Sequence, residues 1–210
     1  MGTLLLNMND SNPMRSISFR RSNVLLHVHL SSTMLIIFGG LPGSGKSTIA
    51  QLLVQKRPAA YLRVDAIEHA ILQSEDQKNV GPSGYMVAYA LATSNLSLGV
   101  PVVADSVNPL EITRRAWREV ATKIASPFIE VEVVCSDCME HQRRVASRKS
   151  DIPGFKLPTW DSVVSREYEP WQSMRLKIDT ALTTADAATE LILEQWRVLS
   201  ANSSTPLMRA

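Results

Sequence analysis

The sequence predicts an α/β domain in which helices cover both faces of a parallel sheet, and two observations support this fold class. Strand-length apolar runs alternate with amphipathic, helix-length segments over residues 34–199, without an internal repeat or a low-complexity linker. The first of these runs, residues 34–39, is continuously apolar, which is typical of a central strand buried on both faces. The 210 residues, 45% of them hydrophobic, suit one domain with one core.

In the first half of the domain, the helix after the first strand places Ile49, Leu52 and Leu53 on one face. Gly99 is placed to end a later helix as a C-cap glycine, and Pro101 is tolerable near the start of the strand that follows. The elements expected in this half are strands at residues 34–39, 61–64 and 100–104 and helices at residues 47–55, 66–73 and 83–98.

In the second half, Ile112, Ala116 and Val120 form one apolar helical stripe. Asp137 and Thr159 are suitable N-caps for two further helices, because their side-chain oxygens can accept hydrogen bonds from backbone N–H groups. The elements expected in this half are helices at residues 110–124, 137–148, 159–171 and 185–199 and strands at residues 128–135 and 174–178.

The segment before the domain, residues 1–33, is rich in Ser and Asn and carries three arginines and a single acid. It can be a loosely ordered extension, an organellar transit peptide, or an added edge strand at residues 24–30. We adopt the first interpretation, because termini without packing partners usually fray. The expected domains are therefore an extension at 1–33, the main domain at 34–199 and a loose tail at 200–210.

The composition indicates the compartment and the kinds of partner. A net charge of +2 is too small to indicate a nucleic-acid or membrane-surface partner. Two cysteines provide no disulfide framework, which favours a reducing, cytoplasmic location, with organellar import through residues 1–33 as a lesser alternative. The longest apolar candidate for a membrane span, residues 85–98, is short and interrupted by polar residues, so we expect no membrane partner.

A phosphate-binding motif, G-x-x-x-x-G-K-S, lies between the first strand and the first helix. Its glycines allow a tight loop whose backbone N–H groups point at phosphate oxygens, next to the positive end of the helix dipole. Lys46 is expected to reach the β- and γ-phosphates of ATP, and the Ser47 hydroxyl to ligate Mg²⁺. The expected nucleotide-binding residues of this loop are Gly40, Leu41, Pro42, Gly43, Ser44, Gly45, Lys46, Ser47 and Thr48.

Two aspartates follow strands of the expected sheet. Asp105 suits a Mg²⁺ ligand, direct or through water, and its alternative role is to cap the next turn. The next residue is Ser106 rather than the glutamate with which motor ATPases generally activate water, which argues against a motor. Asp65 is the candidate general base for an attacking hydroxyl, and its alternative role is the N-cap of a helix at Ala66. The residues alone leave open which aspartate is the base.

A basic segment, residues 143–149, leads into a loop at 150–158 that is rich in Pro, Asp and Gly. Arg144 and Arg148 are four residues apart and share one helix face, where guanidinium groups can stabilise the charge of a transferring phosphoryl group. Loops of this composition often serve as lids. The alternative interpretation is a solvated helix face.

Two other groups of residues are interpreted as structural rather than functional. Cys135 and Cys138, with His141 nearby, lack the second pair of ligands that a zinc site needs. Arg114 and Arg115 differ by about 100° around their helix, so at most one should point inward.

With these motifs, the chain resembles the P-loop kinases related to zeta toxin, chloramphenicol phosphotransferase, polynucleotide kinase and gluconate kinase, which have an AAA-type ATP-binding domain. The resemblance covers Met34 to about Leu199. It implies the three-layer P-loop NTPase fold, with five parallel strands in the order 2-3-1-4-5 and a short lid. It also implies that Arg144 lies near the adenine and that Arg148 lies on the phosphates. In polynucleotide kinases the acceptor motif resembles D-x-x-R, whereas here the fourth position is Glu68, which favours an uncharged acceptor.

The expected function is an ATP- and Mg²⁺-dependent kinase in which Lys46, Asp65 and Arg148 act on transfer to a hydroxyl of a small molecule. One alternative is a polynucleotide 5′-hydroxyl or nucleotide-sugar kinase, so nucleic acid is a less favoured partner. Another is an ATP-dependent switch protein with slow ATPase activity. We expect a monomer or a homodimer.

Overall fold

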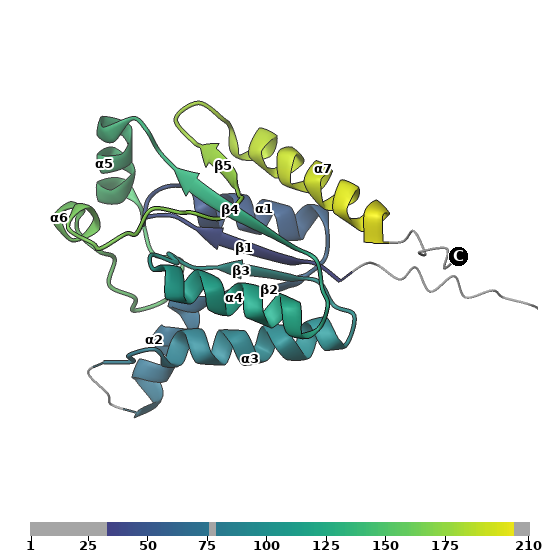
Figure 1. Cartoon of the computed structure of the whole chain (residues 1–210). Coiled ribbons are helices and arrows are strands. Elements are labelled where there is room, and N and C mark those ends of the chain that lie inside the picture. Colours follow the sequence, from purple (N-terminus) through teal and green to yellow (C-terminus); the bar gives the residue numbers. More distant parts are fainter. Residues whose placement is uncertain (1–32, 76–78, 204–210) are drawn as a thin grey trace, which may run out of the picture.

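The computed structural model describes residues 33–75 and 79–203, which contain one sheet of five parallel strands (Figure 1). The strand order is β2-β3-β1-β4-β5, as the resemblance implied, so the predicted fold class is confirmed. The strands are β1 (Leu35–Gly39), β2 (Ala60–Arg63), β3 (Val102–Asp105), β4 (Phe128–Val134) and β5 (Leu176–Asp179).

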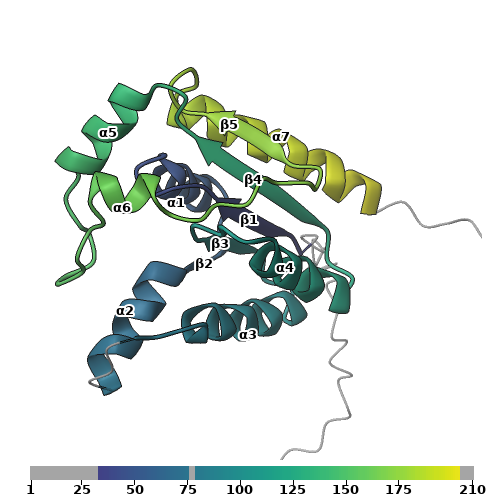
Figure 2. The same cartoon turned by 60° about the vertical axis from the view of Figure 1, so that its left-hand side comes forward.

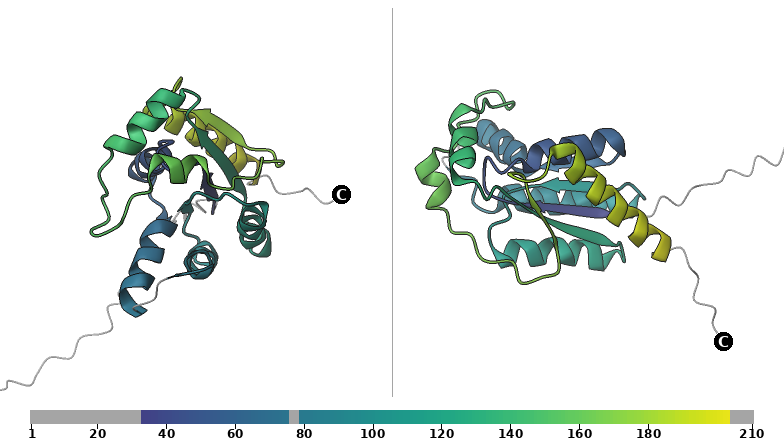
Figure 3. Two further views of the ribbon diagram at one scale, coloured as in Figure 1. Left: turned by 90° about the vertical axis from the view of Figure 1, so that its left-hand side faces the viewer. Right: turned by 90° about the horizontal axis from the view of Figure 1, so that it is seen from above.

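Strand β1 lies at the centre of the sheet because its residues are apolar on both faces. Leu35 and Ile37 pack into one core cluster, Ile36 and Phe38 into the other, and all four are fully buried. Helices α1 and α7 cover one face of the sheet, and α3 and α4 cover the other, which gives three layers (Figures 1 and 2). The carboxyl ends of the strands are surrounded by α2, α5 and α6 (Figure 3, left).

Most expected helices are present within a few residues of their predicted bounds. Asp137 and Thr159 are the N-caps that the sequence predicted, and each accepts a hydrogen bond from a backbone N–H three residues on. The helices are α1 (Lys46–Lys56), α2 (Val64–Glu75), α3 (Ser83–Ser97), α4 (Glu111–Lys123), α5 (Cys138–Ser147), α6 (Trp160–Val164) and α7 (Ala185–Ser203).

The predicted helix at 159–171 is wrong beyond Val164, where α6 ends. Pro170 disfavours a helical conformation at the residue before it, and the backbone carbonyl oxygens of Glu169 and Pro170 bind the Arg114 side chain instead of helical N–H groups.

Some expectations for the chain ends concern residues outside the described part. The N-terminal extension, with its alternatives of a transit peptide and an edge strand at 24–30, lies there, apart from residue 33. Residues 200–203 continue α7, so the tail expected from residue 200 begins at least four residues later, and 204–210 are outside the described residues. None of the helices in the described ranges is both long and apolar enough to cross a membrane.

Candidate active site

The loop of the phosphate-binding motif joins β1 to α1 and requires glycine at defined positions. Gly40 and Gly43 have positive φ angles of 147° and 86°, which disfavour any other residue. A Cβ atom on Gly40 would lie 2.2 Å from the Val133 carbonyl oxygen, and one on Gly43 would lie 2.5 Å from a methyl group of Val145. The neighbouring elements therefore pack directly on the loop backbone.

Three hydrogen bonds from different elements hold this loop in place. The His141 Nε2–H of α5 donates to the Pro42 carbonyl oxygen at 2.9 Å. The Thr180 hydroxyl, just after β5, donates to the Ser44 carbonyl oxygen at 2.8 Å. The backbone N–H of Gly40 donates to the carbonyl oxygen of Val107, after β3, at 3.0 Å. The loop is therefore shaped before a ligand binds.

The bond to Pro42 also gives His141 a structural role. Cys135 is half-buried and Cys138 is exposed, and both are free thiols. Within the described ranges, no three His, Cys, Asp or Glu side chains cluster closely enough to hold a metal ion.

A cavity of about 500 Å³, the P-loop cavity, opens beside Lys46, Ser47 and Thr48. The Lys46 side chain is 5% exposed and forms no hydrogen bond or ion pair with a described residue. A lysine that lines a cavity and has no partner in the protein favours an anionic ligand. The basic residues that line the cavity are Lys46, Arg63, Arg143, Arg144, Arg148 and Lys149, against one acid, Asp151.

A second cavity of about 450 Å³, the β5–α7 cavity, adjoins the first, with Gly45, Thr48 and Arg144 lining both. Its remaining wall is Ile49 and the loop at residues 180–185. The Arg144 guanidinium is fixed there by hydrogen bonds to Glu140 at 2.7 Å and to the Thr180 hydroxyl oxygen at 2.8 Å. Hydrogen bonds from Arg143 and Arg144 lower the pKa of Glu140 to about 2. The structure thus places Arg144 between two cavities of similar size.

Asp105 lies at the carboxyl end of β3, in register with Phe38 of β1 and Arg63 of β2. Its carboxylate is 1% exposed, accepts a hydrogen bond from the Tyr61 hydroxyl at 2.7 Å, and lies 4.0 Å from Nε of Arg63. Burial and the charge of Asp105 raise the pKa of Tyr61. The other oxygen, Oδ1, is buried and has no hydrogen-bond partner among the described residues, so one lone-pair site remains available.

Asp65 is the second residue of α2 and lines a smaller cavity of about 200 Å³, the Asp65 cavity. The strand expected to run to this aspartate ends at Arg63, and α2 begins at Val64, so Asp65 is not the N-cap of a helix at Ala66. Its carboxylate instead lies in the first helical turn, where the helix dipole favours negative charge.

Glu68, one turn further along α2, lines the same cavity. Burial, with the charge of Asp65 as a second cause, raises the pKa of Glu68 to about 7, and the charge of Arg166 opposes the rise.

Arg148 follows the last residue of α5 and lines both the P-loop cavity and the Asp65 cavity. Its Nε and Nη2 atoms are buried without a hydrogen-bond partner in the described part of the chain. Burial lowers the pKa of Arg148, while the charge of Asp65 opposes this change. Arg63 also lines both cavities and was not identified from the sequence, although a basic residue at a strand end beside Asp65 was a signal that could have found it.

The loop predicted as a lid rests on α2 and β2. Asp151 pairs with Arg63 at 2.6 Å, and the Pro153 carbonyl oxygen accepts a hydrogen bond from His69 at 2.8 Å. The ring of Phe155 meets the imidazole of His69 edge-on at 5.8 Å. The loop therefore forms part of the wall of the Asp65 cavity.

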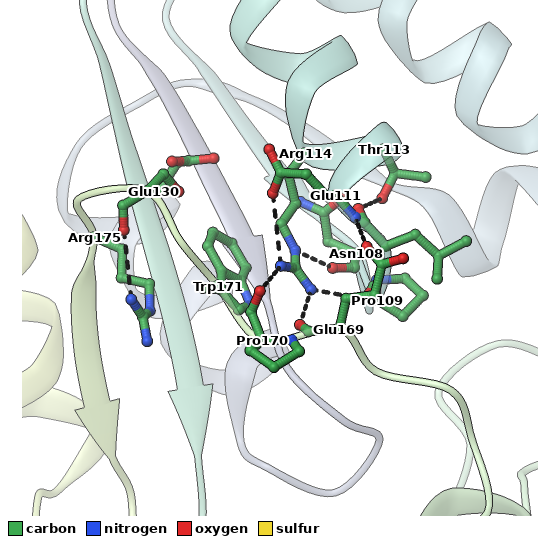
Figure 4. A network of polar contacts seen from close by, with 12 residues as sticks. Asn108, Pro109, Glu111, Thr113, Arg114, Glu130, Glu169, Pro170, Trp171 and Arg175 are labelled. Atoms are coloured by element: carbon green, nitrogen blue, oxygen red, sulfur yellow. Dashed lines mark hydrogen bonds and ion pairs between the residues drawn. The ribbon is translucent and has the colours of Figure 1, made fainter.

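Of the two consecutive arginines on α4, Arg114 is fully buried and Arg115 is exposed, so one points inward. The Arg114 guanidinium lines none of the three cavities described above. It donates hydrogen bonds of 2.5–3.2 Å to four backbone carbonyl oxygens and lies over the ring of Trp171 (Figure 4). The carbonyl oxygens belong to Asn108, Pro109, Glu169 and Pro170. Arg114 thus ties the loop after β3 to the segment before β5.

Comparisons with known proteins agree with this architecture. A cytidylate kinase of Thermotoga sp. is 26% identical over 159 residues, 68% of this chain and 72% of that protein. An adenylyl-sulfate kinase of Prochlorococcus marinus is 28% identical over 181 residues, 78% of this chain and 83% of that protein. The solved structure of a Mycobacterium tuberculosis APS kinase in complex with AMPPNP and APS has a TM-score of 0.62 at 20% identity, and covers 79% of this chain and 98% of its own.

The sequence family described as an AAA domain, AAA_33, matches residues 35–160, more than half of the chain. This stretch contains the phosphate-binding loop, Asp65, Asp105, Arg144 and Arg148. The chain therefore belongs to the AAA-domain family and has the fold of the P-loop kinases.

Proposed function

We propose that this chain is an ATP- and Mg²⁺-dependent kinase that transfers the γ-phosphoryl group to a hydroxyl of a small molecule. The observation that carries the proposal is the way in which two cavities meet. Arg63, Arg148 and Leu157 line both the P-loop cavity, which holds Lys46, and the Asp65 cavity. A phosphoryl group positioned between the cavities would lie beside cations that face both sides.

On the nucleotide side, we assign the β- and γ-phosphates to the P-loop cavity, next to Lys46 and the N-terminus of α1. The adenine ring of ATP is assigned to the β5–α7 cavity, whose wall includes Arg144 and uncharged residues of the loop after β5. The relative that is complexed with AMPPNP and APS supports an adenine nucleotide as the ligand.

Ser47 and Asp105 would hold Mg²⁺, directly or through water. Both offer the hard oxygen atoms that Mg²⁺ prefers, and the unpartnered, buried Oδ1 of Asp105 fits a cation or its bound water. When bound, Mg²⁺ would neutralise charge on the β- and γ-oxygens.

In the transfer step, the acceptor hydroxyl oxygen forms a bond to the γ-phosphorus, and the bond from this phosphorus to the β–γ bridging oxygen breaks to release ADP. Asp65 accepts the hydroxyl proton, and Arg148 stabilises the charge on the transferring group. Asp65 is favoured over Asp105 as the base because Asp65 lines a cavity, whereas Asp105 is buried and bonded to Tyr61.

A small acceptor is favoured by the size of the Asp65 cavity. Its volume of about 200 Å³ is below the roughly 300–1,000 Å³ of sites for drug-sized ligands. Names of two relatives, a cytidylate kinase and an adenylyl-sulfate kinase, also indicate small-molecule acceptors. A polynucleotide end fits this cavity less well.

The test is transfer from γ-labelled ATP into a metabolite pool. We expect a labelled product with the wild type and none with Lys46→Ala, while the fold is retained. Lys56→Ala is the matched control, because it removes a lysine from the exposed end of the same helix. Hydrolysis of ATP to phosphate, without any labelled product, would instead identify an ATP-dependent switch protein.

A further inference from the structure

The basic residues around the candidate active site are distributed between the P-loop cavity and the Asp65 cavity. Arg63 and Arg148 line both cavities, as described above. Lys156 of the lid and Arg166, beyond α6, line the Asp65 cavity and are absent from the wall of the P-loop cavity. The cations that line the P-loop cavity and not the Asp65 cavity are Lys46, Arg143, Arg144 and Lys149.

Some cations of the Asp65 cavity have an acidic partner in the protein and others do not. Arg63 is paired with Asp151 at 2.6 Å. The side chains of Lys156 and Arg166 form no hydrogen bond or ion pair with a residue in the described ranges, although the charge of Arg166 acts on Glu68. Two basic side chains thus border a small cavity without a fixed anionic partner.

The carboxyl groups of the cavity do not balance these charges. Its wall contains the cations Arg63, Arg148, Lys156 and Arg166, and the acids Asp65 and Glu68. With a pKa of about 7, Glu68 is only about half ionised at neutral pH. Because Asp151 already pairs with Arg63, the cations that remain are Arg148, Lys156 and Arg166. They outnumber the ionised acids of the wall, so the Asp65 cavity has an excess of positive charge.

We propose that the acceptor is a compact alcohol that carries an anionic group, a carboxylate, sulfate or phosphate, and that Lys156 and Arg166 bind this group. The inference rests on the proposed function, because it takes the Asp65 cavity as the acceptor site. The expectation of an uncharged acceptor depended on Glu68 standing where an arginine was sought. The fold supplies cations from the lid and from the segment after α6, which that sequence argument did not consider.

The first test measures anion binding next to an occupied nucleotide site. The protein is saturated with Mg²⁺ and AMPPNP, so that the P-loop cavity is blocked, and is titrated calorimetrically with acetate, sulfate and phosphate in turn. We expect saturable binding of at least one anion, weakened at least about tenfold in Lys156→Ala/Arg166→Ala, because charge-assisted hydrogen bonds are the strong ones. Which anion binds most tightly identifies the chemical group.

The matched control is Lys123→Ala/Arg115→Ala, which removes the same two charges from exposed positions of α4. Binding that is absent in the wild type, or equal in the two double variants, overturns the inference while the proposed function stands. Failure of AMPPNP itself to bind overturns the proposed function, and the inference falls with it.

The second test uses matched acceptors with γ-labelled ATP: glycerol against glycerate and glycerol 3-phosphate, and glucose against gluconate. We expect transfer to an anionic member, with its KM raised about 10- to 100-fold in Lys156→Ala/Arg166→Ala while kcat and the KM for ATP change little. Transfer confined to the uncharged members, or an acceptor KM that is the same in both double variants, contradicts the inference and leaves the kinase activity established.

Discussion

The guanidinium carbon of Arg114 lies 4.5 Å from the ring centre of Trp171, and the same indole packs against Gly39 at the end of β1. A Cβ atom on Gly39 would lie 2.4 Å from Cζ2 of Trp171, so the ring fits against a bare backbone. Trp171 therefore packs against both the start of the phosphate-binding loop and the buried arginine, although these residues come from distant parts of the chain.

Arg114→Lys is expected to destabilise the fold by roughly 2–5 kcal/mol. An ammonium cannot reach four carbonyl oxygens in the fork geometry of a guanidinium, and each buried group left without its partner costs about 1–3 kcal/mol. The measurement is urea unfolding, with Arg115→Lys on the exposed face as the control, expected within about 0.5 kcal/mol of the wild type. Equal stabilities of the two variants would contradict the role of Arg114 in holding the loop after β3 to the segment before β5.

Asp65→Asn is expected to lower kcat by roughly 10²–10⁴-fold and to leave ATP affinity nearly unchanged, because a general base acts on the acceptor. Steady-state kinetics and nucleotide titration separate the two effects. Asp161→Asn, at an exposed position of α6, is the control for loss of one carboxylate. An unchanged kcat would limit Asp65 to a favourable charge in the first turn of α2.

Arg148→Ala is expected to lower the transfer rate by roughly 10³-fold with little loss of stability, if its unpartnered guanidinium nitrogens meet the phosphoryl group. Amide exchange over residues 143–158 should slow when AMPPNP binds, because the lid would gain contacts. Arg197→Ala, at an exposed position of α7, serves as the control. Normal turnover, with exchange indifferent to the nucleotide, would leave a charged helix end without a lid function.

Glu68→Gln tests the pH dependence of stability. The folded-state pKa of Glu68 is raised from 4.5 to about 7, so folding is favoured by its protonated form. This contribution is fully present below pH 4.5 and is lost as the pH rises through about 7. The thermal midpoint of unfolding should therefore fall more between pH 5 and pH 8 in the wild type than in Glu68→Gln. The exposed Glu167→Gln should follow the wild type, and an identical fall in Glu68→Gln would show that Glu68 ionises freely.

The parts of the fold that could be predicted from sequence depend on local patterns. The central strand and the phosphate-binding loop are recognisable because an apolar run, glycines and a lysine are adjacent in the chain, whereas the strand order came from the family resemblance. Pro170 was a local signal against a helix that runs to residue 171, but the bonds that Glu169 and Pro170 make with Arg114 could not be predicted, because Arg114 is far away in sequence.

The lining of the Asp65 cavity was harder to predict for the same reason. Arg63, Lys156 and Arg166 belong to a strand end, a loop and an irregular segment, and no spacing rule connects them. They meet because β2 lies at one edge of the sheet and the loop after α5 rests on α2. Cavity composition is thus a property of the folded chain that motif spacing does not encode.

If the loop at 150–158 opens as the predicted lid, the hydrogen bond from His141 to Pro42 limits where its hinge can lie. Val145, one turn further along the same helix, packs against Gly43, so α5 contacts the phosphate-binding loop at two positions. A swing of α5 as a rigid arm would break these contacts and distort the loop that it supports. The pivot of such a lid would therefore lie after Ser147, and substrate entry and product escape would require the displacement of a short flap while the helix stays in place.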